Sequence, residues 1–134
     1  MCPQKRELQR VRKRAEYQVI QARGRRIKTS HFVLIVWSGN GEQSQARLGI
    51  TASRKIGGAV VRNRAKRVIR EAFRRSGDLW APDVDVVVIV RRALDELKVA
   101  DVLDEWSRAG SLIQRRIDEA RSDLRARAAV PSGA

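Results

Sequence analysis

Apolar residues recur in short runs that predict a helix and two strands in the first half of the chain. Residues 15–23 carry apolar side chains at helical spacing, and Gly24 follows as a plausible end. Residues 31–37 (HFVLIVW) are mostly β-branched or aromatic, and a turn-forming segment, residues 39–41, separates them from a second extended run, residues 46–52. These two runs predict a β-hairpin with a long loop.

The second half begins with a long amphipathic segment. Residues 60–75 follow a helical pattern that ends near Gly77, and residues 85–90 (DVVVIV) form an apolar run typical of a buried strand. Residues 99–128 again have helical spacing, interrupted near Gly110. The order helix, strand, strand, helix, strand, helix indicates an α+β fold, a two-layer α/β sandwich in which helices pack on a small sheet.

Length and composition fit one compact domain, because 134 residues with 43% hydrophobic and 33% charged side chains can bury a core under a charged surface. We expect this domain to span residues 1–128, with a loosely ordered basic arm over about residues 1–14 and a flexible tail over residues 129–134. Cys2 is the only cysteine, which favours a reducing, cytoplasmic setting. The apolar run of residues 86–90 is too short to span a membrane.

The charge of the chain is strongly asymmetric. The formal net charge is +14, and residues 1–75 hold 20 Lys or Arg against 4 Asp or Glu, whereas the rest of the chain holds 9 against 11. An excess of this size is tolerated most easily when a polyanion is the usual partner. Nucleic acid is therefore the expected ligand of the first half.

The helix predicted over residues 60–75 separates its apolar and basic residues. At about 100° per residue, one side is apolar, with Val61, Ala65, Val68, Ile69 and Ala72. The opposite side is a stripe of Asn63, Lys66, Arg67, Arg70 and Arg74, with Arg62 and Arg64 at the two edges. Like charges at this spacing destabilise an isolated helix, whereas an RNA phosphate backbone would offset their repulsion. A solvated basic face without a partner is the alternative.

The segment before this helix is also suited to anions. Ser53, Arg54 and Lys55 supply a hydroxyl and two positive charges, and Gly57-Gly58 supplies flexible backbone beside the helix N-terminus. Together with the stripe, this segment predicts a continuous surface for RNA phosphates.

The sequence SRKIGGAVVRNRAKRVIREAFRR, with RLGITA just before it, closely resembles the signature of the bacterial ribonuclease P protein family, centred on Arg62-Asn63-Arg64. The resemblance is strong over residues 47–75. It implies that Arg54, Lys55, Arg62, Asn63, Arg64, Lys66, Arg67, Arg70 and Arg74 face RNA. It also implies a small, mostly antiparallel sheet with ribosomal-protein-like topology and a left-handed crossover around the long helix, against the usual right-handed rule.

The resemblance further implies a function. Proteins of this family bind a catalytic RNA and assist Mg²⁺-dependent removal of the 5′ leader from precursor tRNA. The expected partners are ribonuclease P RNA and precursor tRNA, with no membrane and no protein partner required. Mg²⁺ would be held mainly by the RNA, and no catalytic residue and no metal ligand is expected in the protein.

The family also holds the single-stranded leader in a cleft between the first helix and the sheet. The resemblance places Tyr17 and Phe32 there, with Ser53 nearby and Arg12, Lys13 and Arg14 at the mouth, in keeping with the use of aromatic faces and basic grooves for single strands. Gln21 and Ile35 stand where family members often have aromatics, which predicts weaker stacking. That Tyr17 and Phe32 are core residues is an equally open interpretation.

Other candidates for chemistry are weak. His31 is the only histidine and has no cysteine or acidic residue near it in sequence, so it predicts neither a metal site nor a catalytic triad. The acidic pairs at residues 95–96, 104–105 and 118–119 are expected to be solvated. Two alternatives remain: a ribosomal or other structural RNA-binding protein, and a DNA-binding helix-turn-helix module, which the strands flanking the basic helix disfavour.

Overall fold

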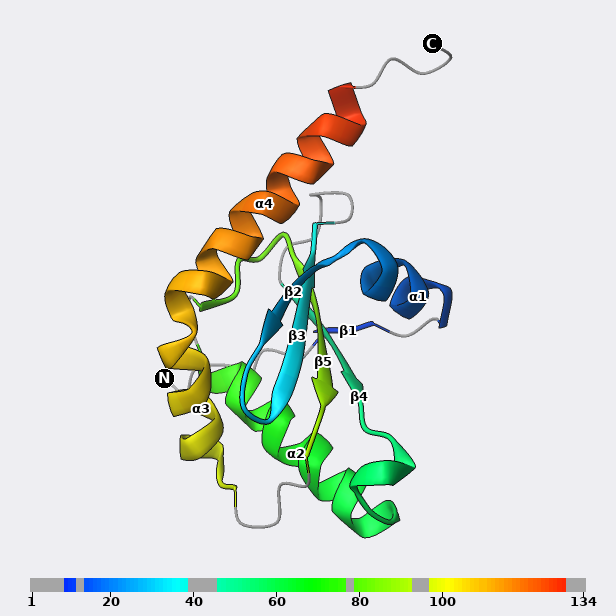
Figure 1. The fold of residues 1–134 in the computed structure, drawn as a ribbon, viewed down its shortest axis with the longest axis vertical. Helices are drawn as coiled ribbons and strands as arrows, with labels where there is room; N and C mark the ends of the chain where they lie inside the picture. The colour runs from blue at the N-terminus through cyan, green and yellow to red at the C-terminus, as the bar shows by residue number, and fades with distance from the viewer. Residues whose placement is uncertain (1–8, 12–13, 39–45, 77–78, 93–96, 130–134) are drawn as a thin grey trace, which may run out of the picture.

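The computed structural model describes residues 9–11, 14–38, 46–76, 79–92 and 97–129, which form one sheet with helices on both of its faces (Figure 1). Each predicted helix and strand is present within one or two residues of its expected bounds. The helices are α1 (Arg14–Arg23), α2 (Ala59–Arg75), α3 (Val99–Arg108) and α4 (Gly110–Ala129), with a 3₁₀ turn, η1 (Arg54–Ile56), before α2. The strands are β1 (Gln9–Arg10), β2 (Arg25–Lys28), β3 (Phe32–Trp37), β4 (Arg47–Thr51) and β5 (Asp85–Val90).

The strand order of the sheet is β1-β4-β5-β3-β2. The β1–β4 and β4–β5 pairs are parallel and the β3–β5 and β2–β3 pairs antiparallel, so the sheet is mixed rather than mostly antiparallel. The expected α+β class is confirmed. Helix α2 joins β4 to its parallel neighbour β5, a crossover whose left hand stays a prediction from the resemblance.

The predicted hairpin between β3 and β4 is wrong. Strand β5 lies between them and pairs with both, Val87 facing Ile35 on one side and Gly49 on the other. The tight hairpin of the fold is instead β2–β3, in which Lys28 pairs with Val33. Strand β2 was missed because its sequence, RRIK, has a single apolar residue, Ile27, and only that side chain is buried.

Alternate residues of the central strands point to two separate apolar clusters, as the pleat of a strand requires. The larger cluster lies under α2, α3 and α4 and takes Phe32, Leu34 and Val36 from β3. The smaller cluster lies under α1 and takes Ile35, together with Val87 of β5. Because β5 is apolar on both faces, it is the central strand that joins the two clusters.

The basic arm is partly folded, in contrast to the expectation that it is loosely ordered. Gln9 and Arg10 pair with β4, and the N–H of Val11 donates to the carbonyl of Leu48 at 3.1 Å. Val11 is 3% exposed and belongs to the cluster under α1. This buried residue fixes the arm at the edge of the sheet; residues 1–8 and 12–13 lie outside the described ranges.

The C-terminal part is helical, with a break between α3 and α4 at residues 109–110, as predicted. The expected tail falls almost wholly in residues 130–134, outside the described ranges. Within those ranges, no helix has the length and hydropathy needed to span a membrane.

Candidate nucleic-acid interface

Helix α2 has the two faces that its sequence predicts. Ala65, Ile69 and Ala72 are fully buried against the sheet and α3. Asn63 and Arg67 are exposed on the opposite side. The remaining stripe residues also reach solvent, since Arg74 is exposed and Lys66 and Arg70 are partly exposed. The packing of one face therefore fixes the orientation of the other, and the basic stripe is held on a rigid element.

Arg62 and Arg64 are half-buried on opposite flanks of α2. Arg64 donates from Nη2 to the carbonyl of Leu97, at 3.4 Å, on the segment that leads into α3. The Nε of Arg62 is buried and has no hydrogen-bond partner among the described residues. A buried donor without a partner is costly, so a group that accepts this hydrogen bond would stabilise Arg62 in place.

Most basic residues of the stripe also lack the ion pairs that several other arginines of the protein form. Within the described ranges, no carboxylate pairs with Lys66, Arg67 or Arg70, and the acidic residue of α2, Glu71, pairs with Arg74 and Arg75 in the last turns. Arginines on other surfaces do have carboxylate partners; these are Arg25, Arg47, Arg108, Arg116 and Arg121. The fold pairs several of its other arginines with carboxylates and leaves Lys66, Arg67 and Arg70 available for an external anion.

The loop before α2 presents further positive charge. Arg54 and Lys55 are exposed on η1, and Ile56 anchors this turn in the core at 9% exposure. Gly57 has φ +145°, and a Cβ there would lie 2.9 Å from the Cβ of Val61, so glycine is required on both counts. Gly58 caps α2 without a side-chain hydrogen bond, which leaves the N-terminal N–H groups of the helix to other acceptors.

The opposite face of the sheet carries α1 and Tyr17. The Tyr17 ring is half-buried and lies directly against the backbone of Gly49, where a Cβ would come within 2.7–2.9 Å of two ring atoms and the hydroxyl oxygen. Around it, Val33, Trp37 and Ile89 are also only partly buried. This partly exposed apolar surface around Tyr17 is here called the α1-side surface, and it is the surface where the resemblance predicts that the leader binds.

Phe32 is not part of the α1-side surface. Its side chain is 0% exposed in the larger cluster, where it packs edge-on against Trp106 of α3 with ring centroids 6.1 Å apart. The strand pleat gives the reason, since Phe32 points to the face opposite Val33 and Ile35. Of the two open interpretations, the structure assigns Phe32 to the core and Tyr17 to the surface.

The other residues predicted for the cleft are less well defined. Arg14 is exposed at the first position of α1, and Ser53 is exposed immediately before η1. Arg12 and Lys13 lie outside the described ranges. The structure thus brings together the predicted α2 residues on one helix, and gives the predicted leader site one aromatic residue, Tyr17.

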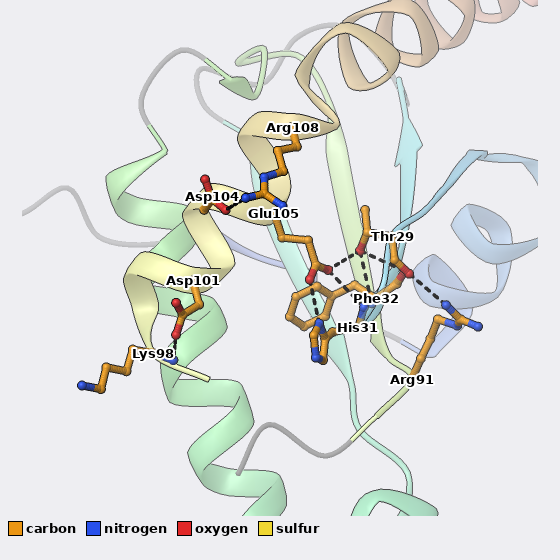
Figure 2. A network of polar contacts seen from close by, with 9 residues as sticks. All are labelled: Thr29, His31, Phe32, Arg91, Lys98, Asp101, Asp104, Glu105 and Arg108. Atoms are coloured by element: carbon orange, nitrogen blue, oxygen red, sulfur yellow. Dashed lines mark hydrogen bonds and ion pairs between the residues drawn. The ribbon is translucent and has the colours of Figure 1, made fainter. Parts of the chain in front are cut away.

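His31 has an acidic partner that its sequence neighbourhood did not reveal. As Figure 2 shows, Glu105 of α3 accepts hydrogen bonds from His31 Nδ1 at 2.6 Å, from the His31 N–H at 3.1 Å and from the Thr29 hydroxyl at 2.6 Å. Burial alone would raise the pKa of Glu105, but these hydrogen bonds outweigh it and the pKa is lowered. Glu105 is therefore a structural link between the β2–β3 turn and α3, and the expectation that it is solvated is wrong.

The sequence did not predict the contacts that Arg10 and Trp37 make in the fold. Arg10 was assigned to a loose arm, and only its pairing with Leu48 places it beside α2. The Trp37 ring stacks under the guanidinium of Arg127, 4.1 Å from its centroid, and Arg127 also donates to the carbonyl of Ser38 at 2.7 Å. Neither position has a local signal, because each depends on a partner far away in the chain.

Comparison with known proteins identifies the family. The family model named Ribonuclease P matches residues 6–114, which is most of the chain. The chain belongs to the ribonuclease P protein family. It is 41% identical over 97 residues to the ribonuclease P protein component of Syntrophus aciditrophicus (strain SB), covering 72% of this chain and 80% of that one, and 37% identical over 94 residues to that of Shouchella clausii (strain KSM-K16), covering 70% and 76%.

Solved structures in the ribonuclease P family share the fold. The Staphylococcus aureus RNase P protein superposes with a TM-score of 0.66 at 29% identity, over 77% of this chain and 93% of that one. The Thermotoga maritima RNase P protein gives 0.65 at 30% identity, over 80% and 96%. RNA binding, partnership with ribonuclease P RNA and a part in tRNA processing follow from membership in the ribonuclease P family, which sets aside the ribosomal and DNA-binding alternatives.

Proposed function

We propose that the chain docks ribonuclease P RNA through the stripe of α2 and the loop before it, and holds the 5′ leader of precursor tRNA on the α1-side surface. In this role it assists Mg²⁺-dependent endonucleolytic removal of the leader, which yields the mature 5′ end of tRNA. The observation that supports the proposal best is that Lys66, Arg67 and Arg70 of α2 have no carboxylate partner in the described ranges.

Electrostatics favours RNA as the ligand of this stripe. Each phosphate that Lys or Arg neutralises releases condensed counterions, and the guanidinium of Arg can donate two parallel hydrogen bonds to one phosphate. Arg67 and Asn63 lie at the exposed centre of the helix face, so both can contact the ligand without a rearrangement of the core. Asn63 adds a neutral donor and acceptor that suits a sugar or a base edge.

The α1-side surface suits a single strand. Tyr17 supplies an aromatic ring for a base, and Arg14, three residues earlier on α1, supplies a positive charge for the backbone. With Phe32 in the core, only Tyr17 of the two predicted aromatic residues remains on this surface. We therefore expect the leader to bind with weaker stacking and a correspondingly greater dependence on salt.

Mg²⁺ enters this proposal as an ion bound mainly by the RNA, where it would activate the attacking water and stabilise the charge that develops on the cleaved phosphate. Within the described ranges, no three His, Cys, Asp or Glu side chains gather into a possible metal site. We assign to the residues of the protein the binding and orientation of the two RNAs.

Reconstitution with ribonuclease P RNA tests the proposal. Cleavage of precursor tRNA would be followed at low Mg²⁺ with the RNA alone, with the wild-type chain, and with the variant Arg67→Ala. The wild-type chain should stimulate cleavage, and Arg67→Ala should weaken binding to the RNA and lower the slope of log affinity against log salt by roughly 0.7–0.9, the value of one lost phosphate contact.

Arg115→Ala is the matched control, because Arg115 is an exposed arginine on α4, away from the stripe. It should leave both the affinity and the salt slope at wild-type values. If the wild-type chain does not stimulate cleavage, the proposed function is wrong. If Arg67→Ala and Arg115→Ala behave alike, the stripe is not the docking surface.

A further inference from the structure

The edge strand β1 brings a basic residue to the flank of α2. Arg10 pairs with Leu48 of β4, and paired residues of neighbouring strands point to the same face of a sheet. Leu48 is buried in the cluster under α2, so Arg10 also points to the α2 side, whereas the next residue, Val11, is buried under α1. Arg10 itself is exposed.

Arg64, on one flank of α2, contacts the segment before α3, so Arg70, on the other flank, lies toward the β4–β1 edge. Helical spacing puts it one turn after Lys66 and one turn before Arg74, and its side chain is half-buried. Burial lowers the pKa of Arg70, and the positive charges of Arg10 and Arg74 lower it further. The register of β1 and the helical position of Arg70 thus place the two arginines on the same face of the sheet and toward the same edge, where their like charges repel each other.

This repulsion is not relieved within the described part of the chain. Arg74 shares Glu71 with Arg75, and no described carboxylate pairs with Arg10 or Arg70. Partly desolvated like charges are unfavourable, and a bound anion removes the penalty. Val11, the residue after Arg10, belongs to the cluster against which Tyr17 packs, so the α1-side surface also approaches this point.

We propose that Arg10 and Arg70 together bind one phosphate group of an RNA backbone at the β1 edge of the sheet. The inference rests on the proposed function and deepens it, because this site lies between the stripe of α2 and Tyr17. An RNA strand bound there connects the two surfaces around the edge of the protein. The phosphate belongs either to ribonuclease P RNA or to the leader of precursor tRNA.

A double-mutant cycle tests the shared site, using Arg10→Gln, Arg70→Gln and the combined variant, each in the full chain. Two ligands distinguish the sources: ribonuclease P RNA alone, and precursor tRNA with or without its leader added to the reconstituted complex. Each single variant should weaken binding of one of these ligands by about three- to tenfold and reduce its salt slope by roughly 0.7–0.9.

The combined variant should lose little more than either single variant, because both remove the same contact. Losses that multiply, with twice the reduction in slope, would show two separate phosphates and overturn the shared site. Unchanged binding in Arg10→Gln, which alters an exposed side chain and leaves the fold intact, would overturn it as well. Arg10→Lys should restore part of the affinity, since it keeps the charge but not the bidentate geometry.

Arg67→Ala, measured beside these variants, separates the two proposals. If Arg67→Ala weakens binding while Arg10→Gln and Arg70→Gln do not, the edge site fails and the stripe stands. If none of the three variants changes binding, both the edge site and the proposed function fail.

Discussion

Gly49 sets the position of Tyr17, which is the one of the two predicted leader-site aromatics that the structure leaves on the α1-side surface. Without a Cβ, its backbone accepts the tyrosine ring in direct contact. The ring can bury part of one face there while the rest stays partly exposed. The glycine of the RLGITA segment is thus a determinant of the surface as well as of the strand.

We predict that Gly49→Ala displaces the Tyr17 ring and weakens leader binding. The added Cβ would lie within 3 Å of the ring, and the side chain can swing away more easily than the sheet can move. The loss should be comparable with that in Tyr17→Ala, on the order of 1–3 kcal/mol for one stacked base. Fluorescence titration with leader-containing and leaderless precursor tRNA measures it.

Leaderless tRNA is the control for Gly49→Ala, because its affinity should not change. Equal losses with both substrates would mean that the substitution perturbs the fold rather than the leader site.

The residues that sequence reasoning placed correctly are those whose environment depends on near neighbours. The α2 stripe follows from helical spacing alone, and the structure reproduces it. The face of the sheet to which Phe32 points could not be predicted, because residues 32–37 are all apolar and show no alternation of polar and apolar positions. Glu105 and His31 are 74 residues apart, so their contact appears only in the folded chain.

At the scale of elements, an ion cluster fastens α1 to the sheet. Arg47 of β4 donates two hydrogen bonds, at 2.8 and 2.7 Å, to Asp85 of β5, and a third at 3.1 Å to Glu16 of α1. Asp85 is 2% exposed and Arg47 is 29% exposed. The cluster thus joins three elements, and its negative member on β5 is the more deeply buried.

This asymmetry predicts unequal effects of removing the two partners. Arg47→Ala leaves the buried carboxylate of Asp85 without its bidentate partner and should lower the free energy of unfolding by roughly 3 kcal/mol. Asp85→Ala should cost less, because Arg47 can turn to solvent and keeps Glu16. Urea unfolding of both variants at neutral pH measures the difference; a larger loss in Asp85→Ala would contradict this account.

Element pairing was the least predictable part of the fold. The turn residues at 39–41 favour a hairpin, and the predicted pairing of β3 with β4 followed from them. It did not take into account that β5 is apolar on both faces, which is typical of a central strand. A central strand needs neighbours on both sides, and β3 and β4 were the available partners. Strand β1 has only two residues and depends on Val11, so its pattern was too short to detect.

At the scale of the whole molecule, the last helix extends past the part of the chain that the family model matches. The match ends at residue 114, whereas α4 continues to Ala129. Ile117 and Ala120 of this extension are buried in the larger cluster, at 0% and 3% exposure. Arg121 donates two hydrogen bonds to Asp83, and Arg25 donates two to Asp123, so the extension is fixed to the domain.

We predict that Ile117→Ala lowers the free energy of unfolding by about 2–5 kcal/mol, the usual cost of a large-to-small change in a core. Arg125→Ala, on the exposed side of the same helix, should stay within about 0.5 kcal/mol of wild type. Denaturant unfolding of both variants is the measurement. Equal stability of the two would mean that α4 beyond residue 114 does not contribute to the core.

The central position of β5 also determines when the sheet can be completed during synthesis. Residues 85–90 leave the ribosome after β1 to β4 and α2, and until then β3 and β4 have no common neighbour. Closing the sheet requires contacts between segments far apart in the chain, which makes folding slow. The basic helix is therefore synthesised before the strand that positions it, and the chain acquires its RNA-binding shape only when its second half has been made.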